Sequence, residues 1–150
     1  MKKILFLLIL LGCVFVSHAQ QSVFKEFEGK SGVTTITFSK SLLSMMGTLP
    51  GENDDINFSA IKNKLDEFQM LVAENDAALQ VRNVCEKVKK ESKFESLMRI
   101  VEEDTVIDFL LGKDGKKNKL LMLIDSEKEI IVFGLTGDFT LQDIQEITSR

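Results

Sequence analysis

The sequence predicts an α+β domain with a mostly antiparallel sheet, a C-terminal meander of four strands, and helices packed mainly on one face. Three observations lead to this class. Helical and strand-like segments are segregated along the chain instead of alternating. The turns between the last four strand-like segments are short, which forces neighbouring strands to run antiparallel. One of these turns contains Asp114-Gly115 between apolar runs, a pattern typical of a tight hairpin.

The N-terminal residues have the composition of an export signal. Lys2 and Lys3 precede an uncharged apolar run, and Ser17-His18-Ala19 offers small residues where a signal peptidase cuts. We expect cleavage between Ala19 and Gln20, so that residues 1–19 are removed and residues 20–150 form one domain. The apolar run is too short to span a bilayer comfortably and no second run follows, so no transmembrane segment is expected in the mature chain.

A second interpretation of the same segment stays open. Leu10-Leu11-Gly12-Cys13 is similar to a lipobox, in which Cys13 would be lipidated and become the first residue. Against this, Val14, Phe15 and Val16 keep the run apolar where lipoproteins continue into a polar tether. Cleavage at Cys13 would also leave a very short apolar core. We therefore expect a soluble exported protein, with the lipoprotein as the alternative.

The first half of the mature chain predicts short helices around two strands. Residues 20–28 favour a short helix, and residues 33–39 alternate with β-branched side chains, as strands do. Helical spacing follows over residues 42–46, and residues 47–57 form a polar loop. Phe58, Ile61 and Leu65 are then spaced as on a short helix, and the apolar run 68–73 predicts the second strand.

The second half predicts the longest helix and the meander. A helix is expected at about residues 77–90, with Asp76 as its N-cap. Its inward face carries Ala78, Val81, Val84, Cys85 and Val88. Four strands are expected at residues 94–103, 105–111, 119–125 and 129–135. A last helix begins at Thr140, where Thr140 and Asp143 predict a capping box and Phe139 with Ile144 a hydrophobic staple.

Two meander strands carry unbroken apolar runs, whereas antiparallel strands with one wet face should alternate. A helix, another subunit or a ligand could cover the second face of these strands. We expect a second subunit or a partner chain, because large exposed apolar patches mark interaction sites. The candidate interaction surface consists of Leu120, Leu121, Met122, Leu123, Ile130, Ile131, Val132 and Phe133.

Several of these segments together resemble a known family. They are Val33 to Lys40 running into Leu42-Leu43-Ser44-Met45-Met46, and Leu120 to Ile124 ahead of Leu135 to Leu141. With the signal peptide, they are similar to the domain of unknown function 4252 family of exported bacterial proteins, over essentially the whole mature chain. The resemblance implies the envelope of a Gram-negative bacterium. It also implies envelope signalling, through neighbouring extracytoplasmic sigma-factor genes, but no activity and no catalytic residue.

The composition excludes several chemistries. The only histidine, His18, is removed with the expected signal peptide, as is Cys13, so that Cys85 is the only cysteine of the mature chain. Ser-His-Asp and Cys-His catalysis and His-containing or thiolate-cage zinc sites are therefore excluded. The formal net charge of −4 becomes more negative without Lys2 and Lys3 and disfavours nucleic acid. We predict no catalytic residue, no cofactor and no metal.

Two small motifs suggest chemistry but have simpler explanations. Ser59-Ala60-Ile61-Lys62 matches the S-x-x-K motif of penicillin-recognising proteins, yet its companion motifs are missing, and we expect a helix whose Ser and Lys face water. Cys85 shares the apolar face of the long helix, so we expect a buried thiol and not a reactive one.

Three polar or flexible clusters remain. The loop from Glu52 to Asn57 lacks the Gly and Glu of an EF-hand, so we expect solvated carboxylates, with weak calcium binding left open. One hairpin carries four lysines, Lys113, Lys116, Lys117 and Lys119. They could bind an acidic partner, or they could act as gatekeepers that keep the neighbouring apolar strands from aggregating, and we expect gatekeepers. Met45 and Met46 are expected in the core, an adaptable binding surface being the alternative.

We therefore predict a non-enzymatic interaction or regulatory accessory module in the periplasm or cell envelope of a Gram-negative bacterium. Its partner is an unknown protein or a second copy, and a free sheet edge could accept a partner strand. A binding protein for a small apolar ligand or lipid is the alternative, and a hydrolase of unknown type is a distant third.

Overall fold

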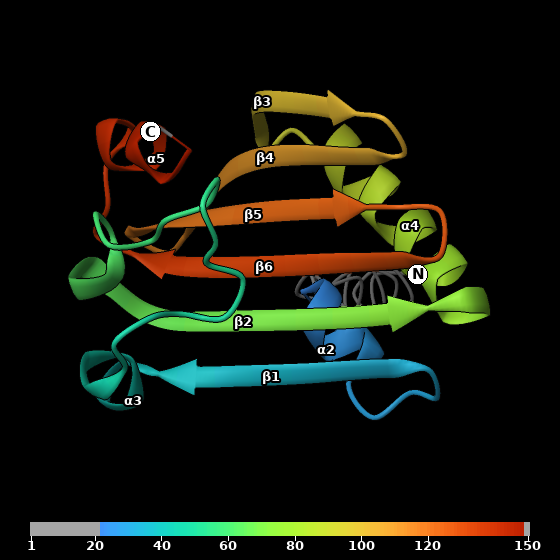
Figure 1. The fold of residues 1–150 in the computed structure, drawn as a ribbon, viewed down its shortest axis with the longest axis horizontal. Helices are drawn as coiled ribbons and strands as arrows, with labels where there is room; N and C mark the ends of the chain where they lie inside the picture. The colour runs from blue at the N-terminus through green and yellow to red at the C-terminus, as the bar shows by residue number, and fades with distance from the viewer. Residues whose placement is uncertain (1–21, 149–150) are drawn as a thin grey trace, which may run out of the picture.

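The computed structural model describes residues 22–148, which build a six-stranded sheet with further elements on both of its faces (Figure 1). The strand order is β1-β2-β6-β5-β4-β3, and all neighbouring strands are antiparallel. The predicted α+β class and C-terminal meander are thus confirmed. The strands are β1 (Val33–Ser39), β2 (Leu65–Glu74), β3 (Glu95–Glu102), β4 (Thr105–Asp114), β5 (Lys117–Asp125) and β6 (Glu129–Gly137).

The expected signal peptide lies outside the described residues, as do its cleavage site between Ala19 and Gln20 and the alternative lipidation site Cys13. Within residues 22–148, no helix is long and apolar enough to cross a membrane.

The order of the strands follows from one long crossover. After β1 and β2, helix α4 (Asn75–Lys90) carries the chain to the far edge, where β3 begins. The meander then returns across the sheet until β6 pairs with β2. As a result, β5 and β6 are central strands, and β1 and β3 form the two edges.

One face of the sheet is covered by α2 (Val23–Phe27) and α4, which lie behind the sheet in Figure 1. Ala78, Val81 and Cys85 of α4 are buried there, as their spacing on one helix face predicts. Val84 and Val88 are half-buried at the margin of the same cluster. This face therefore agrees with the sequence-based expectation for the long helix.

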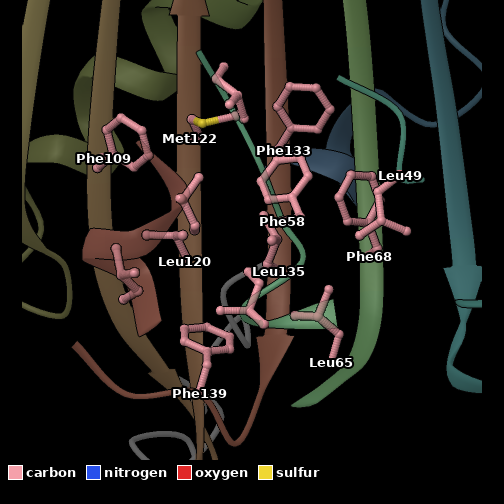
Figure 2. Packing of buried hydrophobic residues seen from close by; sticks show 14 of the residues in the cluster. Leu49, Phe58, Leu65, Phe68, Phe109, Leu120, Met122, Phe133, Leu135 and Phe139 are labelled. Carbon is pink, nitrogen blue, oxygen red and sulfur yellow. The ribbon is translucent and has the colours of Figure 1, made fainter. Parts of the chain in front are cut away.

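The opposite face is covered by residues 46–61, here called the covering loop, and by the short helix α5 (Leu141–Ile147) (Figure 1). Leu49 and Phe58 of the loop lie over Phe68 and Phe133 of the sheet (Figure 2). Helix α3 (Lys40–Met45) contributes the buried Leu43 to the same cluster. The helices therefore divide between both faces, and the second face depends chiefly on irregular chain.

The short helix expected from Phe58, Ile61 and Leu65 is wrong. Phe58 and Ile61 lie in a turn, a 3-10 turn follows at Lys62–Lys64, and β2 already begins at Leu65. All three side chains are buried in one core cluster. Their inward orientation produces a spacing that imitates a helix although the backbone is not helical.

The N-cap expected at Asp76 is also wrong. Helix α4 begins at Asn75, and its N-cap Glu74 makes no side-chain capping hydrogen bond. Strand β2 continues through Glu74, so the chain enters the helix without a linker. Asn75 makes the reversal with a φ of 54°, in the left-handed region that asparagine tolerates.

Two local predictions in the second half of the chain agree with the structure. The capping box of Thr140 and Asp143 is present at the start of α5, with both reciprocal hydrogen bonds formed. The hairpin predicted at Asp114-Gly115 exists, shifted by one residue. Asp114 pairs with Lys117, so the loop residues are Gly115 and Lys116, and Gly115 has a φ of 62°.

Candidate functional site

The eight residues of the expected interaction surface lie in the interior. Seven of them are buried, and Ile131 is half-buried. The side facing the covering loop holds Leu120, Met122, Ile131 and Phe133, and the side facing α2 and α4 holds Leu121, Leu123, Ile130 and Val132. This corrects the expectation that a second subunit covers one side, because the chain itself covers both.

The covering loop is held in place by its own acidic and amide side chains. The Glu52 carboxylate accepts hydrogen bonds from the backbone N–H groups of Leu49 and Phe58, each at 2.9 Å. Asn53 Oδ1 accepts from the N–H groups of Asp55 and Ile56, at 2.7 and 2.9 Å. Part of the oxygen set that suggested calcium is thus engaged in fixing the backbone. Sequence reasoning missed this role, since nothing in the spacing of Glu52 identifies its partners.

The covering loop lies directly on the sheet. Gly51 has a φ of 88°, and a Cβ atom at this position would lie 2.6 Å from the ring of Phe133. Any other residue would therefore be strained in its backbone and would clash with the core. Among residues 22–148, no group of three or more His, Cys, Asp or Glu side chains could hold a metal ion.

The S-x-x-K motif does not form the arrangement that acyl-enzyme chemistry needs. Ser59 lies in a turn, where its N–H donates to Asn57 Oδ1 at 2.8 Å. The Lys62 ammonium donates to the carbonyl oxygens of Met46 and Gly47. Lys62 thus ties the end of the covering loop to its beginning, and the expected water-facing helix is replaced by a turn.

Cys85 is a buried thiol, as its helix position predicts. It is 3% exposed and packs among the apolar residues between α4 and the sheet. Burial raises the pKa of this thiol to about 12, because the thiolate would lose its hydration. The reactive thiolate is therefore scarce at neutral pH.

We expect Cys85 to react slowly with thiol reagents in the native protein and quickly in denaturant. The Cys85→Ser variant should lose about 1–3 kcal/mol of folding free energy, because a hydroxyl would replace a buried sulfur. Labelling followed by mass spectrometry and urea unfolding measure the two effects. Rapid labelling of the native protein would contradict the burial and reopen a redox role.

Another polar contact that the sequence analysis missed lies beneath α4. Asp108 is 5% exposed in the middle of β4, and its carboxylate lies 2.8 Å from Lys89 Nζ of α4. Burial alone would lower the pKa of Lys89, but hydrogen bonds to Asp108 and Glu86 outweigh it and raise the pKa. The sequence did contain a signal for this contact, because Asp108 is an aspartate within an otherwise apolar stretch of β4. The ion pair fixes the C-terminal half of α4 on the sheet.

The two edge strands differ in how well they are protected. Strand β3 has Arg99 in its middle, Glu95 and Glu102 at its ends, and a bulge between Ser96 and Met98. Charges and bulges of this kind prevent edge-to-edge pairing. Strand β1 has seven residues, none charged and none proline, and pairs with β2 without a bulge. Of the two edges, β1 is the one that lacks this protection.

Exposed apolar side chains accompany this edge. Ile36 of β1 is 40% exposed, and Leu42 and Met45 of the following helix α3 are 42% and 80% exposed. Both methionines were expected in the core. Met46 packs partly against the core, but Met45 is in solvent, so the prediction is wrong for Met45. The alternative of an adaptable surface keeps its support at Met45 only.

The fold and its surfaces define a small α+β domain with one unprotected sheet edge. Residues 27–147 match the family described as Domain of unknown function (DUF4252), and the chain therefore belongs to this family. The resemblance noted from the sequence is thus confirmed. The chain has no significant match among curated proteins and none among solved structures.

Proposed function

We propose that the protein is a non-enzymatic interaction module of the cell envelope, which binds a partner protein by accepting an extended segment beside β1. The observation that supports this proposal is the unprotected edge Val33–Ser39. In strand addition, backbone hydrogen bonds supply affinity and alternate side chains supply specificity. The envelope location rests on the export signal expected at residues 1–19.

The composition of β1 indicates the kind of segment that fits. Thr34, Thr35 and Thr37 flank the exposed Ile36, so an uncharged, β-branched strand would make favourable cross-strand pairs. A second copy satisfies the same rule, because antiparallel pairing centred on Ile36 brings no like charges together. We favour a partner protein, and self-association is an outcome of the test below.

Photo-crosslinking in the native host tests the proposal. A photoreactive residue at Thr37 on β1 should give a defined crosslinked product, whereas one at the exposed Val101 on β3 should not. A product of twice the chain mass would identify self-association through β1. Absence of a product from Thr37, or the same products from both edges, would contradict strand addition at β1.

A charge variant tests the edge independently. Because Thr37 is replaced in this variant, the photoreactive residue is placed at Ile36, which should give the same crosslinked product in the otherwise unchanged chain. Thr34→Lys with Thr37→Lys then places two cations on exposed positions of β1, which should abolish this crosslink without reducing the stability of the domain. The matched control, Val101→Lys, should leave the crosslink unchanged.

A further inference from the structure

A cavity of about 230 Å³ opens on the face of the sheet that α2 and α4 cover. It is formed where three segments distant in sequence meet: the start of α2, the end of α4 with the residues after it, and the β4–β5 hairpin.

The floor of this cavity is apolar. Val23, Phe24 and Leu121 are each no more than 5% exposed, and Val88 and Phe94 are half-buried at the margin of the same core cluster. Because the floor belongs to the packed core, its shape is set by the fold. A ligand chain lying on it would remove further apolar surface from water.

The rim of the cavity is cationic. Lys93, Lys113 and Lys119 line it, and none of them forms an ion pair with any residue in the range 22–148. Lys119 Nζ lies 5.9 Å from the centre of the Phe24 ring, at the boundary between rim and floor. In contrast, Lys117 of the same hairpin is bound to Asp66 and Asp138, at 3.1 and 2.6 Å.

The rim is positive in a protein of net negative charge. Two carboxylates, Glu91 and Asp114, share it with the three ammonium groups, so one positive charge remains in excess. The gatekeeper function expected for the hairpin lysines explains why charges flank apolar strands. It does not explain why Lys93, from a different segment, lies at the same rim. An apolar floor under unpaired ammonium groups fits a ligand with an apolar chain and an anionic head.

We propose that this cavity binds a small amphipathic anion, with its carboxylate or phosphate head at Lys93, Lys113 and Lys119 and a short chain on the floor. The cavity is smaller than the ~300–1,000 Å³ typical of sites for drug-sized ligands, so the ligand has a short chain and is not a whole phospholipid. This site is separate from the β1 edge, and either proposal can fail without the other.

Titrations followed by NMR test the ligand class on the exported chain. Octanoate and octyl phosphate carry both features, octanol lacks the charge, and acetate lacks the chain. At least one of the two anions should shift the methyl signals of Val23, Val88 and Leu121 saturably, with a Kd about tenfold or more below those of octanol and acetate. The preferred anion distinguishes a carboxylate from a phosphate ligand. No saturable shift with either anion would overturn the proposal.

Paired variants test the rim. Lys113→Gln with Lys119→Gln should weaken binding of the preferred anion about tenfold and leave octanol unchanged. Lys87→Gln with Lys90→Gln removes the same charge from the end of α4 outside the cavity and should change the Kd by less than about twofold. Equal losses in both variants would show that general surface charge, and not the cavity, attracts the anion.

Discussion

Replacing either Met122 or Leu123 with glutamate should unfold the domain, although the two side chains point to opposite faces of β5. Met122 is 0% exposed beneath the covering loop, and Leu123 is 3% exposed beneath α4. Burial of a carboxyl group without a partner costs several kcal/mol, and the total stability of such a domain is only about 5–15 kcal/mol. The core cluster described around Met122 contains only apolar side chains. Beside Leu123, the Lys89 ammonium is already bound to Asp108 of the neighbouring strand, whose carboxylate would repel a second one.

Circular dichroism and urea unfolding of the two variants measure this effect. The control Val101→Glu places the same charge on β3, where the side chain is 64% exposed, and should change stability by less than about 0.5 kcal/mol. A folded Met122→Glu or Leu123→Glu variant with normal stability would show that the corresponding face is open in the isolated chain. A second subunit would then be needed to cover it.

The expected outcome differs from what the sequence alone suggests. The apolar runs at residues 120–124 and 130–133 correctly predict that both faces of the sheet are covered. They do not say what covers them, because burial by a loop and burial by a partner leave the same pattern in the strand. The identity of the cover is information carried by other segments of the chain.

Elements with local signals could be predicted. The four strands of the meander are joined by short turns, and α5 begins with a capping box whose two hydrogen bonds join residues three positions apart. The long helix α4 shows its buried face through regular spacing of Ala78, Val81 and Cys85. In each case, the interactions that define the element lie within a few residues of one another.

The covering loop could not be predicted because its interactions are not local. The spacing of its buried side chains, Leu49, Ile56, Phe58 and Ile61, does not reveal the backbone that carries them, since Phe58 and Ile61 imitate a helix where the chain forms a turn. They are held by Glu52 and Lys62, which act across the loop and not along a helix. The open edge at β1 likewise becomes visible only when the strand order is known, since the sequence does not show that β6 pairs with β2 and leaves β1 outside.

Phe58 is the largest buried side chain that the covering loop places on the second face. Its ring is fully buried on the sheet between the rings of Phe68 of β2 and Phe133 of β6 (Figure 2), with edge contacts at 5.7 and 6.2 Å between the ring centres. We expect Phe58→Ala to lower the free energy of unfolding by ~3–5 kcal/mol, because it removes this volume and leaves Phe68 and Phe133 under a weakened cover. Urea unfolding of the purified protein measures the loss.

The same experiment separates a cover supplied by the chain from one supplied by a partner. If residues 46–61 cover the sheet, the stability of both wild type and Phe58→Ala is independent of protein concentration, whereas a subunit interface would make it rise with concentration. Met45→Ala, in the neighbouring helix but 80% exposed, is the matched control and should cost less than about 0.5 kcal/mol. A loss below about 1 kcal/mol for Phe58→Ala, or a stability that rises with concentration, would show that the covering loop does not close this face alone.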